Sequence, residues 1–391
     1  MNNIKYVTLS LLTFLYTLIT VQAEAADKVN NKEELRSSKY SHISKYLETL
    51  HDSEISTILK NGIPVHSGTG GTSAKLEIDG VPIFVKLIPL NELEGKLENY
   101  RSTENLFNLP HYYQYGVNSA GFSAWRELSA HAISTDWVLA GKNKNFPLMY
   151  HWRIVPNTLE KDPLDEEELK NYVKYWNDSS PIGERFRANY NAPSHIALFI
   201  EYIPETLNSW LTKQLVKGDN AIDKAIEMVE RNLSETIAFI NANGMLHFDA
   251  HFHNILTDGE HLYFSDFGLA TSSQFALSKE EMQFFQNHQN FDRCYACGKL
   301  TQWIISRTFG KDRLDEVLQD YAKGKTPPLL PKTVTPFLES IVKRYAPITL
   351  IMKNFFDDLT HKSKTTSYPA KELDKLWIET ITDVGQGVVI D

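Results

Sequence analysis

Residues 63–90 contain the pattern that most limits the possible folds of this chain. The stretch IPVHSGTGGTSAKLEIDGVPIFVKLIPL contains many β-branched residues and is interrupted by two turn signals. The first is the glycine cluster at 68–71, and the second is the pair Asp79-Gly80, which is typical of tight β-hairpins. Two turns so close together predict three consecutive antiparallel strands.

The rest of the chain changes from mixed patterns to mainly helical ones. We expect helices over 90–107, 121–141 and 221–244, strands over 146–155 and from 194, and a charged surface excursion with a helix over 164–186. After Asp266 the chain has helical patterns nearly to its end. This order predicts an α+β fold, with an antiparallel sheet in an N-terminal part over 61–203 and a mainly helical C-terminal part over 204–391.

The N-terminus has the pattern of a secretory signal peptide. Residues 7–21 form an uncharged apolar run of 15 residues, and Ala23 and Ala25 follow at the spacing of a cleavage site. We therefore expect residues 1–25 to be removed on export to a secreted, periplasmic or lumenal location, with an N-terminal membrane anchor as the alternative. The polar segment 26–60 is expected to be a loose lead-in or an exposed first helix, and the mature chain is expected to have no membrane span.

Charge and cysteine content exclude some classes of protein. The net charge of −9 argues against a broad nucleic-acid-binding surface. The two cysteines, Cys294 and Cys297, are too few for a disulfide scaffold. Their spacing favours two packing residues on one helix, with thiol exchange as the alternative. The aromatic stretch HYYQY at 111–115 is expected to belong to the core of the N-terminal part.

The stretch HFDAHFHNIL places three histidines and an aspartate close together. On an extended chain His247, Asp249, His251 and His253 would share one face, and imidazole and carboxylate groups bind zinc or iron. This pattern alone would predict a histidine-rich metal site. The motif SDFG at 265–268 follows it, however, and indicates a different chemistry.

Together, these two motifs resemble the catalytic core of the protein-kinase-like superfamily. The family pattern is His-x-Asp, an Asn five residues after that Asp, a turn, and then Asp-Phe-Gly, and His247, Asp249, Asn254 and Asp266 match it in order. The resemblance implies a bilobal fold that binds ATP with Mg²⁺ or Mn²⁺. It also implies that Asp249 is the catalytic residue that orients the acceptor hydroxyl, and that Asn254 and Asp266 hold the metal ion through oxygen ligands.

Residues upstream extend the resemblance. Gly68, Gly70 and Ser73 lie where the family covers the ATP phosphates with a glycine-rich loop, although Ser73 stands in place of the third glycine. Lys86, in IFVK on the third expected strand, corresponds to the phosphate-binding lysine of the family. These four residues are therefore expected to contact the nucleotide.

Three further features have counterparts in the family. The partner of the lysine is expected to be Glu127, with Glu98 as the alternative. The segment from Glu201 to Ile203 resembles the hinge, whose backbone binds adenine. Asp292 resembles the structural aspartate of a long helix in the C-terminal lobe.

The chain also departs from ordinary protein kinases. Phe248 replaces the arginine of the His-Arg-Asp motif, and His251 replaces the lysine that follows the catalytic aspartate. A histidine there is similar to the aminoglycoside- and choline-kinase branch, and it implies a contact of His251 with the γ-phosphate or the acceptor. No Ala-Pro-Glu motif follows the Asp-Phe-Gly, and the segment 269–290 is short. Both features weaken the case for a protein substrate.

The resemblance predicts an ATP- and Mg²⁺-dependent phosphotransferase. Its acceptor would be a hydroxyl on a protein or on a small molecule. Two alternatives stay open: a nucleotide-binding pseudokinase that acts as an interaction module, and a metal-dependent hydrolase built on the histidines.

Overall fold

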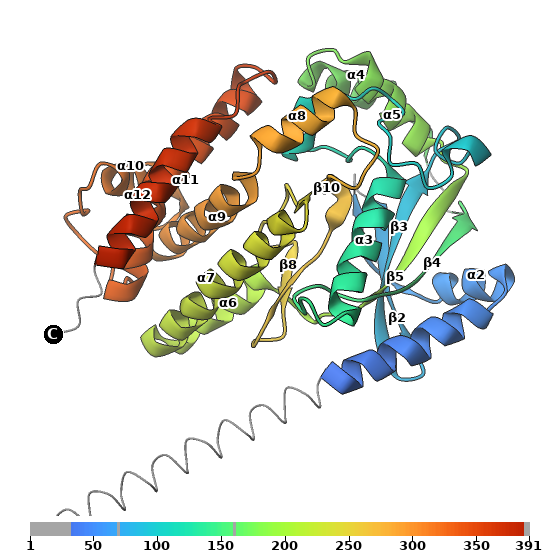
Figure 1. The fold of residues 1–391 in the computed structure, drawn as a ribbon, viewed down its shortest axis with the longest axis horizontal. Coiled ribbons are helices and arrows are strands. Elements are labelled where there is room, and N and C mark those ends of the chain that lie inside the picture. The colour runs from blue at the N-terminus through green and yellow to red at the C-terminus, as the bar shows by residue number, and fades with distance from the viewer. Residues whose placement is uncertain (1–32, 69–70, 159–161, 387–391) are drawn as a thin grey trace, which may run out of the picture.

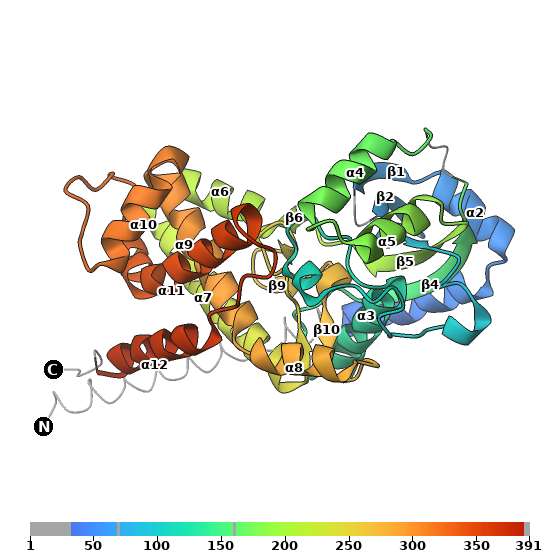
Figure 2. The same ribbon diagram turned by 90° about the horizontal axis from the view of Figure 1, so that it is seen from above.

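The computed structural model describes residues 33–68, 71–158 and 162–386. Figures 1 and 2 show a sheet with its covering helices at one end of the molecule and a group of helices at the other end. The fold is mixed α and β, as predicted, with the larger sheet in the N-terminal part. The predicted signal peptide, residues 1–25, lies outside the described residues. Within the described ranges no helix is long and apolar enough to cross a bilayer.

The N-terminal sheet has five antiparallel strands in the order β1-β2-β3-β5-β4. The strands are β1 (Ile63–Gly68), β2 (Gly71–Ile78), β3 (Val81–Leu90), β4 (Met149–Pro156) and β5 (Ser194–Glu201). The three consecutive strands predicted from residues 63–90 are therefore confirmed. Asp79 and Gly80 have φ values of 48° and 76°, the positive φ that a two-residue hairpin turn requires.

The sheet is covered by helices on both faces. Phe199 of β5 packs with the helix at 33–49 and with α2 (Asp52–Lys60). Its neighbour Leu198 points to the opposite face and packs with α3 (Ala124–Leu139). This alternation follows from the two-residue period of a strand, and it places α3 against the face of the sheet opposite the N-terminal helices.

The segment 26–60, in its described part, is neither a loose lead-in nor an exposed first helix. Ile43, Leu47 and Ile55 are fully buried and pack against the sheet. These apolar side chains lie on one face of their helices, and the polar remainder hides that stripe in the overall composition.

The helix expected over 90–107 is also absent from the structure of that segment. The segment forms turns and one short 3₁₀ helix, η1 (Leu97–Asn99). Its apolar residues form no buried stripe, since Leu97 is 89% exposed. The Asn91 side chain instead accepts a hydrogen bond of 3.0 Å from the Glu94 amide, a local bond that competes with a helix.

Helices fill the charged excursion and most of the C-terminal part, as the sequence predicts. The excursion contains two helices, α4 (Glu166–Tyr175) and α5 (Ser180–Tyr190). The C-terminal helices are α6 (Leu207–Lys217), α7 (Asp219–Ala242), α8 (Lys279–Asn287), α9 (Phe291–Thr308), η4 (Lys311–Arg313), α10 (Leu314–Ala322), α11 (Pro336–His361) and α12 (Ala370–Gln386). Gly244, just after α7, has a φ of +74°, so it ends that helix as expected.

Short strands bring the two sequence motifs together. The short strands are β6 (Glu205–Thr206), β7 (Met245–Leu246), β8 (Ile255–Thr257), β9 (Leu262–Phe264) and β10 (Thr271–Ser272). β7 pairs with β10, and β8 pairs with β9. The segment 247–254 runs from β7 to β8, and the segment 265–270 runs from β9 to β10. Because both pairs of strands frame both segments, the two motifs lie side by side.

The aromatic stretch at 111–115 lies only partly in the core of the N-terminal part, where Tyr113 packs with Phe122, Trp176 and Ile182. It forms the 3₁₀ helix η2 (His111–Tyr115). The Tyr115 ring lies 5.0 Å from that of Phe355 and 6.0 Å from that of Phe291, which belong to C-terminal helices. This part of the chain therefore reaches across to the helical part of the molecule.

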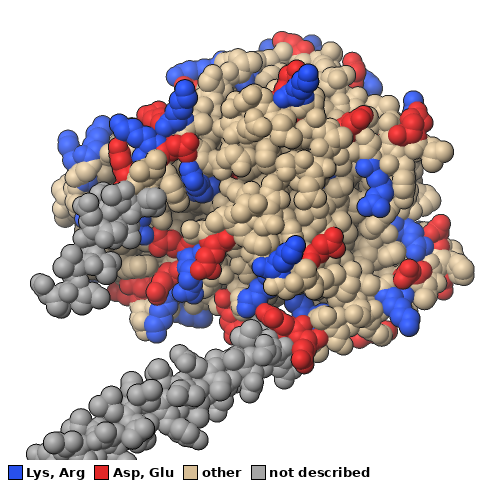
Figure 3. Space-filling model, viewed as in Figure 1, with Lys and Arg blue, Asp and Glu red and all other residues tan. Residues whose placement is uncertain are grey.

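Surface charges are mixed on the face that Figure 3 shows. Basic and acidic side chains lie beside each other around a large uncharged area. The expected absence of a nucleic-acid surface stays a prediction.

Candidate functional site

A buried cluster of charges joins the sheet, α3 and the second motif. Lys86 is on β3, where it pairs with Ser73 of β2 and Leu198 of β5 in the register of the sheet. Its Nζ lies 2.6 Å from Glu127 Oε1 and 2.8 Å from Asp266 Oδ1. The partner of Lys86 is therefore Glu127, and the alternative, Glu98, lies in η1.

The three side chains of the cluster differ in their exposure to solvent. The Lys86 and Glu127 side chains are 11% and 5% exposed, whereas Asp266 is 45% exposed. The ion pair of Lys86 with Glu127 is thus sealed, and Asp266 is the member that meets solvent.

The charges of Lys86 and Asp266 hold each other ionised. Burial by itself lowers the pKa of Lys86, but the carboxylates of Asp266 and Glu127 outweigh burial and raise it well above its usual value. Burial would likewise raise the pKa of Asp266, but Lys86 and the Gly268 amide bring it well below its usual range. For Glu127 burial dominates, and its pKa is raised although Lys86 opposes the shift.

The backbone around Asp266 is shaped to present its carboxylate. Asp266 has a φ of 61°, a left-handed conformation that is uncommon for residues other than glycine, and it precedes the 3₁₀ helix η3 (Phe267–Leu269). Its Oδ1 accepts a hydrogen bond of 3.3 Å from the Gly268 amide. A Cβ on Gly268 would lie 3.3 Å from Asp266 Oδ1 and 3.4 Å from Glu127 Oε2, so a side chain there would crowd both acids.

Asp249 and Asn254 are joined across the loop between β7 and β8. The Asn254 side-chain amide donates to Asp249 Oδ2 at 2.9 Å and to the Asp249 carbonyl at 3.2 Å. Burial, together with the negative charge of Asp266, raises the pKa of Asp249 to about 8. The two acids are therefore near enough to repel each other, an arrangement that favours a cation between them.

His247 and His251 form hydrogen bonds with backbone groups in and beside this loop. His247 is fully buried, its Nε2 donates to the Ser265 carbonyl at 3.0 Å, and its Nδ1 accepts from the Asp249 amide at 3.3 Å. His251 Nδ1 accepts from the amides of His253 and Asn254, at 3.2 Å and 3.3 Å. Its Nε2 lies 3.7 Å from Asp249 Oδ1, and burial lowers the pKa of the ring to about 4.

The alternating histidines do not form a metal-binding group. In the part of the chain that the structure describes, the group of acidic and histidine side chains close enough to share an ion is Asp258, Glu260 and His261. His247, with its nitrogens engaged in the loop, and His253, which is exposed, do not belong to it.

Asp292 forms hydrogen bonds with the backbone of the loop between β7 and β8. This fully buried residue of α9 accepts hydrogen bonds from the amides of His247 and Phe248, at 2.7 Å and 2.9 Å. Phe248 has a φ of 62°, and burial raises the pKa of Asp292 to about 6. The structural role expected of Asp292 therefore has a geometric basis, because it holds the strained backbone just before Asp249.

The glycine-rich loop is described in part. Gly68 ends β1 and pairs with Gly71, while Gly70 lies outside the described residues. Ser73 is buried on β2, directly opposite Lys86. These positions put the first hairpin beside the charge cluster.

The segment predicted as a hinge is tied to the N-terminal helix. Arg36 donates to the Glu201 carboxylate through Nε at 2.9 Å and through Nη2 at 2.6 Å. The Leu148 amide donates to the same carboxylate at 3.1 Å. The Glu201 side chain is thus occupied, whereas Ile203 follows the end of β5. No local sequence signal indicates Arg36, because its partner lies far along the chain.

A second group of residues missed in the sequence covers the loop between β7 and β8. The segment between η2 and α3 passes over Asp249 so closely that a Cβ on Gly116 would lie 3.6 Å from Asp249 Oδ1 and 2.8 Å from Leu269 Cδ1. The Gln114 side chain donates to the Leu269 carbonyl. Gly116 has a φ of +75°, and a glycine after an aromatic run is the one sequence signal that marks this approach.

Comparison with known proteins adds no name to this site. No model of a known protein family matches the chain. No curated protein matches it significantly. The geometry of the residues therefore carries the functional argument.

Proposed function

We propose that the protein is an ATP- and Mg²⁺-dependent phosphotransferase with a bilobal, protein-kinase-like arrangement. The observation that carries this proposal is the position of Lys86 between Glu127 and Asp266. Phosphoryl transfer depends mainly on positioning and on neutralising phosphate charge. A buried lysine held by one acid, next to a second acid that meets solvent, provides both functions.

The residues present fit a hard divalent cation. Lys86 and the Gly268 amide both contact Oδ1 of Asp266, so Oδ2 is the oxygen that would bind Mg²⁺ or Mn²⁺. Asn254 donates its amide group to Asp249 and would offer its carbonyl oxygen to the metal ion. An Asp and an Asn oxygen are suitable ligands for Mg²⁺, which supplies charge neutralisation at the phosphates when it is bound.

The remaining groups have separate tasks in the proposed reaction. Lys86 binds phosphate oxygens, helped by the hairpin that carries Gly68 and Ser73. The backbone from Glu201 to Ile203 binds adenine. A cation at Asp266 would offset the negative charge that helps to raise the pKa of Asp249. The Asp249 carboxylate then orients the acceptor hydroxyl and takes its proton, while the hydroxyl oxygen bonds to the γ-phosphorus and the bond from that phosphorus to the departing ADP breaks.

His251 is suited to a hydrogen bond rather than to a charge. Its low pKa keeps the ring neutral near pH 7, and its Nε2 lies on the side of Asp249 Oδ1. A neutral imidazole in this position positions the acceptor or a phosphate oxygen without adding positive charge.

The direct test is transfer of label from Mg²⁺-ATP labelled at the γ-phosphate. The mature protein is incubated alone, with a protein mixture and with a panel of small alcohols, and an Asp249→Asn variant serves as the control. Label that appears on one acceptor class with the wild type, and is lost with the variant, supports the proposal and identifies that class. Nucleotide binding without any transfer would favour the pseudokinase alternative, and the absence of both would reject the proposal.

A further inference from the structure

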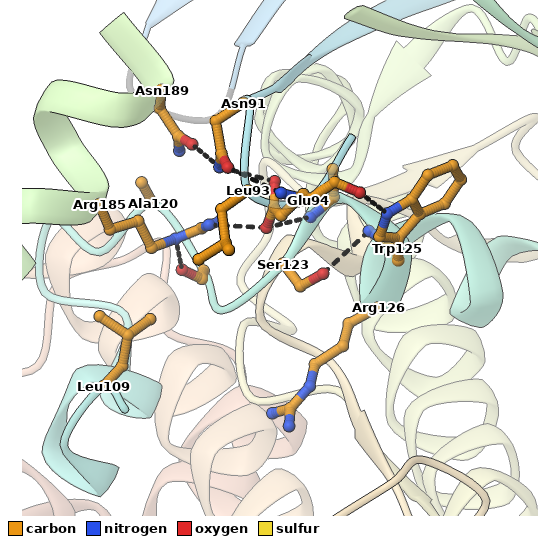
Figure 4. Close-up of polar contacts among 12 residues, drawn as sticks. Asn91, Leu93, Glu94, Leu109, Ala120, Ser123, Trp125, Arg126, Arg185 and Asn189 are labelled. Atoms are coloured by element: carbon orange, nitrogen blue, oxygen red, sulfur yellow. Dashed lines mark hydrogen bonds and ion pairs between the residues drawn. The ribbon is translucent and has the colours of Figure 1, made fainter. Parts of the chain in front are cut away.

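Helix α5 carries a buried arginine that reaches the beginning of α3. The Arg185 side chain is 4% exposed. Its Nη1 donates to Glu94 Oε1 at 2.8 Å (Figure 4). Its Nε donates to the Gly121 carbonyl at 2.9 Å. One guanidinium therefore connects the excursion between β4 and β5 to Gly121, just before α3, and to Glu94 in the segment after β3.

Glu94 also forms hydrogen bonds with residues in the first turn of α3. Its Oε1 also accepts from the Ala124 amide at 3.3 Å, and its backbone carbonyl accepts from Trp125 Nε1 at 2.8 Å. Asn91 donates to the other carboxylate oxygen at 2.8 Å. A carboxylate at the N-terminus of a helix stabilises that helix end through its free amides and its dipole.

Two short paths lead from this network to the charge cluster. Glu127 follows Ala124 by one helical turn, so the orientation of the helix start determines where Glu127 points. Gly121, which Arg185 holds by its carbonyl, lies against the Gly268 carbonyl so closely that no side chain fits between them. The Gly268 amide in turn donates to Asp266 Oδ1 at 3.3 Å, and a Cβ added to Gly268 would lie 3.4 Å from Glu127 Oε2.

Arg126 of α3 connects this helix to two further segments of the chain. Arg126 Nη2 donates to Glu281 Oε1 of α8 at 2.7 Å, with both side chains nearly buried. Arg126 Nε donates to the Thr103 carbonyl at 2.7 Å. The segment that follows Asp266 is thus attached to α3 through fixed charges of the chain itself.

We propose that Arg185 and Glu94 are positioning residues that hold α3 where Glu127 meets Lys86. The excursion helix α5 is then an internal activating element, and α3 takes its catalytic position without a partner protein and without phosphorylation. A buried ion pair adds little net stability compared with apolar residues of the same size. We therefore assign this pair the role of positioning α3 rather than of stabilising the fold. The catalytic part of this inference rests on the proposed phosphotransferase function.

The experiment compares removal of this pair with removal of an exposed pair on the same helix. Arg185→Met is compared with Arg187→Met, since Arg187 forms an ion pair of 2.6 Å with Glu166 in which both side chains are at least half exposed. A double variant, Arg185→Met with Glu94→Leu, removes both buried charges, so that no unpaired acid is left to unfold the protein. Hydrogen exchange of residues 121–128 and 266–270, thermal stability, and kcat and KM for Mg²⁺-ATP are measured for each.

We expect Arg185→Met to speed exchange in both segments and to lower kcat/KM by about 10- to 100-fold, while Arg187→Met changes neither. The double variant should regain thermal stability but not kcat/KM. Stability and activity that recover together would show a purely structural role and overturn the proposal. Unchanged exchange in the two segments of Arg185→Met would also overturn it.

Hydrogen exchange separates this inference from the proposed function. If the wild type neither binds Mg²⁺-ADP nor transfers phosphate, the phosphotransferase proposal fails. Faster exchange at 266–270 in Arg185→Met would even then support the coupling of Arg185 to the Asp266 segment.

Discussion

The ammonium of Lys86 and the carboxylate of Glu127 lie 2.6 Å apart, sealed between β3 and α3. Burial raises the pKa of Glu127, and Lys86 is the group that opposes this shift most strongly. Each charge therefore depends on the other, and the pair fixes the distance between the helix and the sheet. Asp266 completes the cluster from the second motif and leaves one side of it open to solvent.

Replacing the lysine tests the centre of this cluster. Lys86→Met should lower kcat/KM for Mg²⁺-ATP by about 100-fold or more, because the phosphates lose their buried cation. The exposed Lys142→Met is the matched control. Since Lys86→Met leaves Glu127 buried without its partner, the double variant with Glu127→Leu separates loss of chemistry from loss of stability. Near-normal turnover in a folded double variant would reject the assigned role.

Asp249 should affect turnover and not nucleotide binding. Asp249→Asn keeps a side-chain oxygen for Asn254 but cannot take a proton, so we expect kcat to fall by about 100-fold or more with little change in the Kd for Mg²⁺-ADP. Asp312→Asn, on the exposed surface, serves as the control. Titration calorimetry and single-turnover assays measure the two quantities. Loss of binding together with turnover would contradict the separation of roles.

Asp266 should determine the metal dependence of binding. Asp266→Asn is expected to bind nucleotide equally weakly with Mg²⁺ and with EDTA, because a carboxylate ligand is lost. The histidine-rich metal site makes the opposite prediction. Zinc would co-purify with the wild type, the pair His251→Ala and His253→Ala would remove it, and activity would be indifferent to Asp266. Elemental analysis of the three proteins decides between the two.

His288 should make the fold sensitive to acid. Its Nδ1 donates to the Phe284 carbonyl at 2.6 Å, its Nε2 accepts from the Tyr115 hydroxyl at 2.7 Å, and burial lowers its pKa to about 4. As the pH falls from about 6.5 to about 4, the His288 ring is protonated in the unfolded chain but stays neutral in the folded protein. The free energy of unfolding therefore falls by up to about 3 kcal/mol over this range. Urea unfolding of the wild type, His288→Gln and the exposed control His361→Gln over this range isolates the effect. An equal pH slope in all three would contradict it.

The two cysteines should be unreactive in the folded protein. Both are free and buried on α9, and burial raises the pKa of Cys294 to about 12 and that of Cys297 well above its usual value. A thiol reagent at pH 8 should modify them slowly in the native state and rapidly in denaturant. Rapid native labelling, or a disulfide between them, would favour the thiol-exchange alternative.

Short-range features of the fold were predictable from the sequence. Asp79-Gly80 indicates its hairpin because few residue pairs adopt positive φ so readily, and Gly244 indicates the end of α7 for the same reason. Glu127 could be chosen over Glu98 as the partner of Lys86 because its helix runs directly toward a strand. All of these depend on backbone preferences and periodicity within a few residues.

Long-range contacts were decided by the tertiary structure alone. The N-terminal helix carries Arg36 to Glu201, and α5 carries Arg185 to Glu94 and Gly121, and nothing near any of these residues in the sequence marks its partner. Local preference and periodicity determine which segments become strands and helices. The order and spacing of Asp249, Asn254 and Asp266 can be read directly from the sequence. Which buried charges meet depends on how those segments pack, because an ion pair forms only where folding brings its two side chains to one desolvated point.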